Sequence, residues 1–263
     1  MKTLRINNVE IEFLLTGEKN SETIVFVHGL GANLSQFRLQ QDYFSKNFKV
    51  IAINLRGHGK SLQVHKYTPS KFKLSVMSTD IIELLAYLKI DKVHFVGNSL
   101  GGNIGYEILR SHPHILKSLT TFGTTGQLNK PRFSLGILKF IYKIISPKAI
   151  GNLSQLAGQT KESKDRIREM FSKVNKITLL STLPNIAKFD YLDVIKNSSV
   201  PGMIIKGEKD QNINRTIQST INEFENRGNF KLHEIKDTGH FVNLDNPVLF
   251  NKVLEDFILN LNK

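Results

Sequence analysis

Short runs of apolar residues recur along the chain, and several of them end at a glycine or a polar turn. Residues 23–27, 48–53 and 92–96 show the pattern most clearly. A continuous apolar run of this length is typical of a strand that is buried on both faces, as in a parallel sheet. Five further strands are predicted, at residues 4–8, 9–15, 116–122, 202–206 and 230–235.

Helical patterns separate these strands. In residues 70–88, Met77, Ile81 and Leu84 recur on one face at helical spacing, together with Leu85 and Leu88. Strands that alternate with helices indicate an α/β protein, with a mostly parallel twisted sheet and helices on both of its faces. The other predicted helices span residues 35–46, 100–111, 215–225 and 248–261.

One interval, residues 127–193, breaks the alternation because it shows helical patterns and no convincing strand. Ile167, Met170, Phe171 and Val174 lie on one face of a basic helix there. We interpret the interval as a helical cap, or lid, inserted before the strand at 202–206 and placed over the carboxyl edge of the sheet, where ligands bind in open α/β sheets. The core would then consist of residues 1–126 and 194–263.

The charge is strongly basic, and the excess is concentrated in the predicted cap. The whole chain has a net charge of +13, and residues 127–193 hold 12 Lys and Arg against five Asp and Glu. A solvated basic face explains this excess, and so does an anionic partner. No zinc-finger, helix-turn-helix or RNP signature indicates nucleic-acid binding.

The composition also limits where the protein works. There is no cysteine, so disulfides and thiolate metal sites are excluded. The amino-terminal residues have no apolar signal core, and no apolar run is long enough to cross a membrane. We therefore expect a cytoplasmic protein.

The segment Gly97-Asn-Ser-Leu-Gly101 carries the first chemical signal. It fits the pattern G-x-S-x-G, an apolar strand runs directly into it, and a small-residue helix start follows. This strand–turn–helix context is that of a nucleophile elbow, in which a strained turn exposes the serine hydroxyl. Ser99 is thus the candidate nucleophile.

A serine hydroxyl needs a base to take its proton, and His240 is the candidate. Of the eight histidines, it alone occupies a loop after a strand that follows both the nucleophile and an acid. Asp210, which directly follows the strand at 202–206, is the acid predicted to orient the imidazole. Glu208 is its local competitor. The order serine, aspartate, histidine is the one expected for this kind of site.

An oxyanion hole requires two backbone N–H groups. Leu100, which follows the candidate nucleophile, is predicted to supply one of them. The second is expected from Leu30, in the glycine turn His28-Gly-Leu-Gly31 after the strand at 23–27.

Taken together, these segments resemble the α/β-hydrolase superfamily over nearly the whole chain except the cap. The motifs that carry the resemblance are at residues 28–31, 54–61, 97–102, 207–210 and 239–240. The sequence is similar to a branch of small lid-bearing esterases, enol-lactonases, carbon–carbon bond hydrolases and cofactor-free haloperoxidases. In that branch residues 56–61 form a structural turn, so the resemblance assigns Arg56 and His58 no catalytic role. Epoxide hydrolases and haloalkane dehalogenases share the fold but use an aspartate nucleophile, and Ser99 argues against both.

The resemblance implies a serine hydrolase that cleaves a small, apolar-acyl carboxylic ester and needs no metal or organic cofactor. A carbon–carbon hydrolase, a lactonase, and a carrier-protein thioesterase or methyl-esterase would use the same catalytic triad of Ser99, His240 and Asp210. A non-catalytic ligand receptor on this scaffold is the alternative from another class.

The substrate pocket is predicted to include Asn98 and Phe241, beside the catalytic residues. Residues of the cap, among them Phe133 and Leu138, line either an acyl pocket or the underside of a lid packed on the core. The others in this set are Leu135, Ile137, Phe140 and Ile141. The segment 135–145, with its two lysines, also suits contact with an anionic membrane surface, although a lid helix explains the same pattern.

Overall fold

The computed structural model describes residues 1–62, 67–129 and 131–261, and side chains throughout these ranges except at 132–134. Its core is one eight-stranded sheet in the order β1-β2-β4-β3-β5-β6-β9-β10. Strands β1 and β2 pair antiparallel, β2 pairs antiparallel with β4, and all other pairs are parallel. The strands are β1 (Lys2–Ile6), β2 (Val9–Thr16), β3 (Thr23–Val27), β4 (Lys49–Ile53), β5 (Val93–Asn98), β6 (Leu116–Phe122), β9 (Gly202–Gly207) and β10 (Phe230–Ile235).

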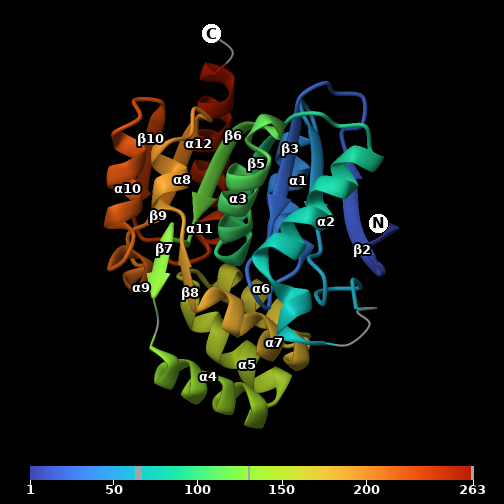
Figure 1. Cartoon of the computed structure of the whole chain (residues 1–263), viewed down its shortest axis with the longest axis vertical. Helices are drawn as coiled ribbons and strands as arrows, with labels where there is room; N and C mark the ends of the chain where they lie inside the picture. Colours follow the sequence, from blue (N-terminus) through green and yellow to red (C-terminus); the bar gives the residue numbers. More distant parts are fainter. Residues whose placement is uncertain (63–66, 130, 262–263) are drawn as a thin grey trace.

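Helices cover both faces of this sheet (Figure 1), which confirms the predicted fold class. Those that follow or flank the sheet strands are α1 (Arg38–Phe44), α2 (Leu74–Tyr87), α3 (Leu100–Ser111), α8 (Leu192–Lys196), α9 (Gln211–Asn214), α10 (Gln218–Glu225), α11 (Val242–Asp245) and α12 (Pro247–Asn260). Four short 3-10 turns accompany them among the described residues, at η1 (Leu34–Phe37), η2 (Pro69–Phe72), η3 (Pro113–Ile115) and η4 (Gln155–Ala157).

The apolar runs read from the sequence form two cores, one on each side of the sheet. Every residue of β3 is buried, because helices cover both faces there. Along this strand Val25 and Val27 join the cluster under α2 and α3, whereas Ile24 and Phe26 join the cluster under α1 and α12. Side chains alternate across a strand, so a continuous apolar run is what a doubly covered strand requires.

The order of the strands reverses between β3 and β5. From β3 the chain moves to β4 on one side, and from β5 it moves to β6 on the other. Such a reversal opens a crevice at the carboxyl ends of the two strands, which is where ligands bind in this class of sheet. The loops after β3 and β5 carry the glycine turn at 28–31 and Ser99.

Between β6 and β9 the chain leaves the sheet and forms a helical insertion, defined here as α4 to α7. Its helices are α4 (Arg132–Ile144), α5 (Pro147–Ser154), α6 (Lys161–Phe171) and α7 (Lys176–Ile186). In Figure 1 they lie together at the lower end of the molecule, beyond the carboxyl ends of the strands. The predicted apolar face of α6 is buried at Ile167 and Met170, and Val174 is buried just after the helix.

Three sequence predictions were wrong in detail. Residues 127–193 do contain strands, because β7 (Gln127–Asn129) and β8 (Lys188–Asp190) pair antiparallel at the two ends of the helical insertion. The first strand ends at Ile6, since Asn7 and Asn8 both have positive φ and form the turn of a hairpin. The helix predicted at 70–88 is split, because Lys73 is extended between η2 and α2.

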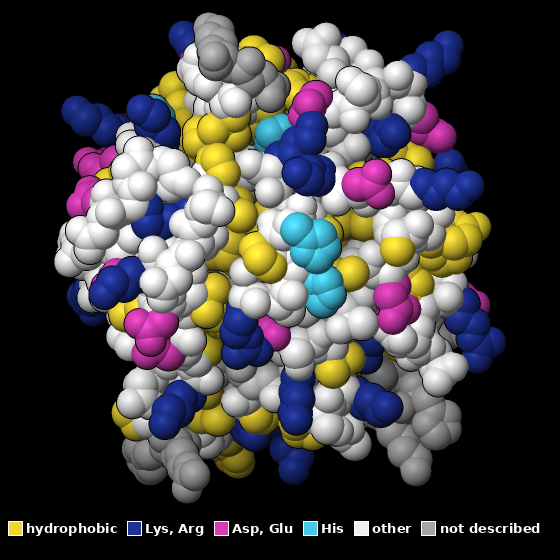
Figure 2. Space-filling model, turned by 45° about the horizontal axis from the view of Figure 1, so that its top comes forward, with side chains coloured by type: hydrophobic (Ala, Val, Ile, Leu, Met, Phe, Trp, Pro, Cys, Tyr) yellow, Lys and Arg dark blue, Asp and Glu magenta, His cyan; other side chains and the backbone are white. Residues whose placement is uncertain are grey.

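The end of the molecule opposite the helical insertion has a mixed surface. Figure 2 turns that end toward the viewer and shows Lys and Arg side chains interspersed with Asp and Glu, with two neighbouring imidazoles near the middle of the view. Within the described residues, no helix is long and apolar enough to span a membrane.

Candidate active site

Ser99 lies in a tight turn between the end of β5 and the start of α3. Its φ of 50° and ψ of −114° are unusual for a residue with a side chain. Such backbone strain persists only where the surroundings impose it. They do so here, because a Cβ atom at Gly101 would lie 2.1 Å from the carbonyl oxygen of Val27. The glycine lets α3 begin directly against β3, and the strand–turn–helix context predicted for Ser99 is present.

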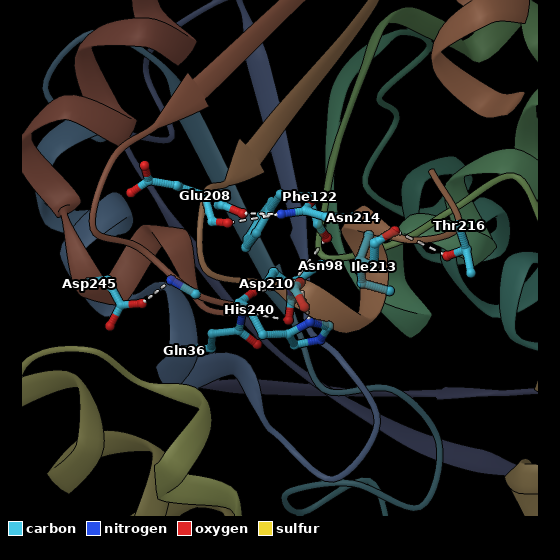
Figure 3. A network of polar contacts seen from close by, with 12 residues as sticks. Gln36, Asn98, Phe122, Glu208, Asp210, Ile213, Asn214, Thr216, His240 and Asp245 are labelled. Atoms are coloured by element: carbon cyan, nitrogen blue, oxygen red, sulfur yellow. Dashed lines mark hydrogen bonds and ion pairs between the residues drawn. The ribbon is translucent and has the colours of Figure 1, made fainter. Parts of the chain in front are cut away.

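His240 and Asp210 meet above the neighbouring strands. The loop after β10 carries His240 and the turn after β9 carries Asp210, and Nδ1 of the imidazole lies 2.7 Å from Oδ2 of the carboxylate (Figure 3). The carboxylate accepts this hydrogen bond, so Nδ1 is the donor, and in the neutral imidazole Nε2 is the nitrogen that carries no proton. The Asp210 side chain is 7% exposed and that of His240 24%, so the carboxylate is buried behind a partly accessible imidazole.

The turn that carries Asp210 is tied to the histidine loop. Lys209 N–H donates to the carbonyl of Thr238 at 2.8 Å, and the amide of Asn214 donates to the carbonyl of Gly207 at 2.9 Å. Glu208, the competing acid, instead accepts a hydrogen bond from the N–H of Asp237 at 2.9 Å. In Figure 3 its carboxylate points away from His240, whereas that of Asp210 points toward it.

Asn98 connects the serine turn to the histidine loop. Its side-chain NH₂ group donates to the carbonyls of Phe122 and His240, each at 3.2 Å. Its Oδ1 accepts from Nε2 of Gln36 at 3.0 Å. The side chain is fully buried, and the prediction that Asn98 forms a wall of the substrate pocket stays a prediction. Its hydrogen-bonding capacity is used inside the protein to hold these two loops together.

The backbone N–H of Leu30 lies in the loop after β3 and that of Leu100 at the start of α3, and both segments border Ser99. A Cβ atom at Gly29 would lie 3.2 Å from Cβ of Ser99, so the glycine turn packs directly on the serine. Among the residues that the structure describes, neither Leu30 nor Leu100 donates its N–H to a protein acceptor. Two unpaired donors beside a serine can stabilise a negatively charged oxygen.

Two buried histidines fix the glycine turn from behind, a role that the sequence reading missed. His58 Nε2 accepts from the N–H of Gly31 at 3.2 Å, and His28 Nε2 accepts from the N–H of Leu55 at 3.1 Å. Burial lowers the pKa of His58 to about 4 and that of His28 well below its usual value. Both imidazoles are thus neutral acceptors near pH 7. The only available signal was the glycine-flanked motif at 56–61, which does not specify a hydrogen-bond partner.

The helical insertion contacts three of the loops at this edge. A Cβ atom at Gly31 would lie 2.8 Å from the ring of Phe171, and Thr178 Oγ1 donates to the carbonyl of Gly57 at 2.9 Å. The Asp245 carboxylate joins the third loop to the insertion, because it accepts from Gly239 N–H at 2.8 Å and from Gln159 N–H at 2.7 Å. Sequence reasoning missed Asp245 too, since nothing in the pattern around it marks its two partners.

The other predicted pocket residues, Phe241 and those of the insertion, fall into four groups. Phe241 is buried, with its ring edge-on to those of His240 (centroids 5.3 Å apart) and Phe171 (6.0 Å). Leu138 and Leu135 are half-buried. The side chain of Phe133 lies outside the described part of the chain. Three other residues are exposed, so they do not form the packed underside of a lid, and their place in a pocket wall stays a prediction; they are Ile137, Phe140 and Ile141.

In the ranges that the structure describes, no three His, Asp or Glu side chains gather in a way that could hold a metal ion. The family model for the alpha/beta hydrolase fold matches residues 22–161, which is more than half of the chain. The chain belongs to the α/β hydrolase fold family.

Three relatives of this α/β hydrolase are distant but cover nearly its full length. It is 22% identical to 3-oxoadipate enol-lactonase 2 of Acinetobacter baylyi, over 99% of this chain and 97% of that protein. A thermophilic esterase from Thermogutta terrifontis has a similar structure, with a TM-score of 0.88 at 17% identity over the whole of both chains. The enol-lactonase from Burkholderia xenovorans superposes with a TM-score of 0.85 at 23% identity, over 98% of this chain and 100% of that one.

Proposed function

We propose that this α/β hydrolase is a serine hydrolase that cleaves a carboxylic ester, with Ser99 as nucleophile, His240 as base and Asp210 as the acid that orients the base. The observation that carries the proposal is the pairing of His240 Nδ1 with the buried Asp210 carboxylate at 2.7 Å, at the same sheet edge as the strained serine turn. This pairing leaves Nε2 free to accept a proton, which is what a serine nucleophile needs.

The reaction begins when Ser99 Oγ attacks the ester carbonyl and His240 Nε2 takes the hydroxyl proton. The oxyanion of the tetrahedral intermediate accepts hydrogen bonds from the N–H groups of Leu30 and Leu100, and the amino end of α3 adds positive potential there. His240 then gives its proton to the departing alkoxide, which leaves an acyl ester on Ser99. Water, deprotonated by the same imidazole, attacks that ester and releases the acid and the free serine.

The helical insertion is proposed to cap the site and to set its substrate preference. It contacts the loops after β3, β4 and β10, and it brings Phe171 against Phe241 beside His240. These apolar rings favour an apolar acyl group over a charged one. The named enol-lactonases among the relatives support a cyclic ester as a second candidate, because a lactone is opened by the same steps.

A chain-length series tests this proposal. Hydrolysis of p-nitrophenyl esters from acetate to palmitate, and of a simple γ-lactone, is measured for the wild type and for Ser99→Ala. Loss of the nucleophile is expected to lower kcat by about 10⁵–10⁶ on every accepted substrate.

Ser75→Ala is the matched control, since Ser75 is exposed and its side chain forms no hydrogen bond within the described residues. It is expected to behave as the wild type. Turnover that is the same in Ser99→Ala and wild type would contradict the proposed mechanism, and binding of an ester without turnover in either would favour a receptor.

A further inference from the structure

A stripe of large apolar side chains faces solvent along α4. Ile137, Phe140, Ile141 and Ile144 follow one another at helical spacing and are 47%, 65%, 41% and 64% exposed. We call these four residues the α4 stripe. Scattered apolar residues are normal on a protein surface, but a contiguous exposed row on one helix marks an interaction site.

The core cannot account for this stripe, because α4 already packs on the protein with its other side. Tyr142 and Ile145 contact a small buried cluster made by Ile150, Val174 and Leu179. The apolar surface of α4 therefore extends around the helix beyond the side that packs on this cluster. In Figure 1, α4 is the outermost helix at its end of the molecule.

A second helix extends the apolar surface at the carboxyl end of α4. The ammonium group of Lys176 donates to the carbonyl oxygen of Lys143 at 2.9 Å, which places the start of α7 beside the end of α4. Ile177, the next residue, is 55% exposed.

The segment of the chain that contains the stripe carries charges of one sign only. Residues 127–161 contain six Lys and Arg and no Asp or Glu. Lys139 and Lys143 on α4, and Lys148 on α5, form no ion pair within the described residues. The opposite end of the molecule differs, since basic and acidic side chains are mixed there (Figure 2).

We propose that the α4 stripe and its flanking lysines bind an anionic lipid surface. An apolar row with unpaired lysines at its side is the pattern of a helix that lies in the plane of a membrane interface, where the apolar side chains enter the acyl region and the ammonium groups reach the phosphates. A bilayer needs no matching cleft, so an outermost convex helix can reach it. A second copy of this chain is a poorer partner, because pairing of two stripes would bring the unpaired lysines of both copies together.

This surface lies outside the residues assigned to ester cleavage, so its test does not depend on the proposed reaction. Binding is measured by co-sedimentation with vesicles of phosphatidylglycerol and, separately, of phosphatidylcholine, using the full chain and Ser99→Ala. Both proteins are expected to bind phosphatidylglycerol vesicles, to bind phosphatidylcholine at least about tenfold more weakly, and to be released by salt.

Two sets of variants separate the apolar and the charged contributions. Phe140→Ser with Ile144→Ser is expected to weaken vesicle binding by about tenfold or more, and Lys139→Gln with Lys143→Gln by about fivefold for each lysine. The matched controls lie on α12: Val248→Ser with Leu249→Ser for the exposed apolar pair, and Lys252→Gln for an exposed lysine. The controls are expected to bind as the wild type does, and thermal melting verifies that every variant is folded.

Several results would overturn the proposal. They are absence of binding to phosphatidylglycerol vesicles, equal binding to both lipids, and unchanged binding by the Phe140 and Ile144 variant. Sedimentation equilibrium provides another, if the wild type is a dimer that Phe140→Ser with Ile144→Ser dissociates. Calorimetric titration with an acidic acyl carrier protein tests the remaining candidate partner. If the chain binds this protein but not the vesicles, the partner of the α4 stripe is a protein and the lipid proposal is overturned.

Discussion

The carboxyl edge of the sheet and helix α4 hold their conspicuous side chains in opposite ways. At the sheet edge, His240 and Asn98 each hydrogen-bond to a partner that is itself buried or fixed by backbone contacts. On α4, the apolar stripe faces solvent. The helix packs on the protein through its other face, at Tyr142 and just beyond its end at Ile145. The arrangement at the sheet edge fixes the positions of its polar side chains, whereas the arrangement on α4 leaves an apolar surface exposed to solvent.

This difference indicates where substitutions matter. A change at the sheet edge leaves a buried donor or acceptor without its partner and displaces a reacting group, so its effect on chemistry is large. A change on the stripe removes side chains that are about half or more exposed, so its effect on folding and on small-ester cleavage is small. Substitutions ranked by expected effect test this contrast.

After the loss of Ser99 itself, the largest effect is expected for His240→Ala, which removes the proposed base. Turnover of a p-nitrophenyl ester should fall by about 10⁴–10⁶, because Ser99 then has no group to take its proton. His114→Ala is the control, since His114 is exposed in η3 and precedes β6 at the opposite edge of the sheet. Equal losses of turnover in the two variants would mean that the carboxyl edge of the sheet has no special role in ester cleavage.

The next effect separates the two acids after β9. Asp210→Asn should lower kcat by about 10³–10⁴, because the amide no longer stabilises the positively charged imidazole or selects its tautomer. Glu208→Gln should change kcat by less than about threefold, since its carboxylate faces the N–H of Asp237. The reverse ranking in steady-state kinetics would transfer the acid role to Glu208.

The pH dependence of stability follows from the buried imidazoles. The pKa of His58 is lowered from 6.5 to about 4, so between these values the unfolded chain binds a proton that the folded chain does not. The free energy of unfolding should therefore fall as pH drops from about 6.5 toward 4, by up to about 3 kcal/mol for this group.

Urea denaturation at several pH values measures this slope. His58→Asn should reduce it without abolishing it, because the pKa of His28 is lowered as well. Slopes that coincide for wild type and His58→Asn would contradict the assignment of His58 as a buried neutral acceptor.

A smaller effect is expected where the helical insertion joins the histidine loop. Asp245→Asn keeps the shape of the side chain but replaces one acceptor oxygen by a donor, which conflicts with the N–H of Gly239 or of Gln159. Stability should fall by about 1–3 kcal/mol, and kcat by about tenfold as the loop shifts. Asp256→Asn, at an exposed position on α12, is the matched control; a variant of Asp245 as active and stable as this control would show that the bridge positions nothing.

The smallest effect is expected on the stripe itself. Ile144→Ser should change the free energy of unfolding by less than about 0.5 kcal/mol and leave hydrolysis of a short ester unchanged. Ile167→Ser is the contrasting variant, because Ile167 is fully buried on α6, and it should cost about 2–4 kcal/mol. Similar losses in the two would mean that the stripe is covered in solution.

The sequence predicted the elements whose signals are local. The mostly apolar runs located the strands because burial on both faces leaves few polar positions. The pair β7–β8 was missed because each strand has only three residues and its partner lies about sixty residues away, so neither shows a periodicity. The break at Lys73 was missed because the apolar spacing continues through it.

The candidate site likewise has features that local sequence signals predicted and features that they did not. The strained turn at Ser99, the order of the acid and the histidine, and the glycine turn at Leu30 all depend on short motifs, and the sequence located them. Asn98 was placed in the pocket because its neighbour is the candidate nucleophile, whereas its side chain points to the carbonyls of Phe122 and His240. Only the folded chain brings those carbonyls together.

The helical insertion was the least predictable region. An amphipathic pattern shows that a helix has an apolar face but not what covers it. For α6 the apolar face lies against the sheet edge, whereas for α4 much of it lies in solvent.

In the proposed mechanism, Ser99 is the nucleophile and His240 activates it. Incubation with a fluorophosphonate, followed by proteolysis and mass spectrometry, tests this directly because the reagent forms a covalent bond only with an activated serine. We predict a single adduct on the peptide that contains Ser99, formed by the wild type and lost in both Ser99→Ala and His240→Ala. An adduct on another serine, or labelling of Ser99 that persists without His240, would contradict the account.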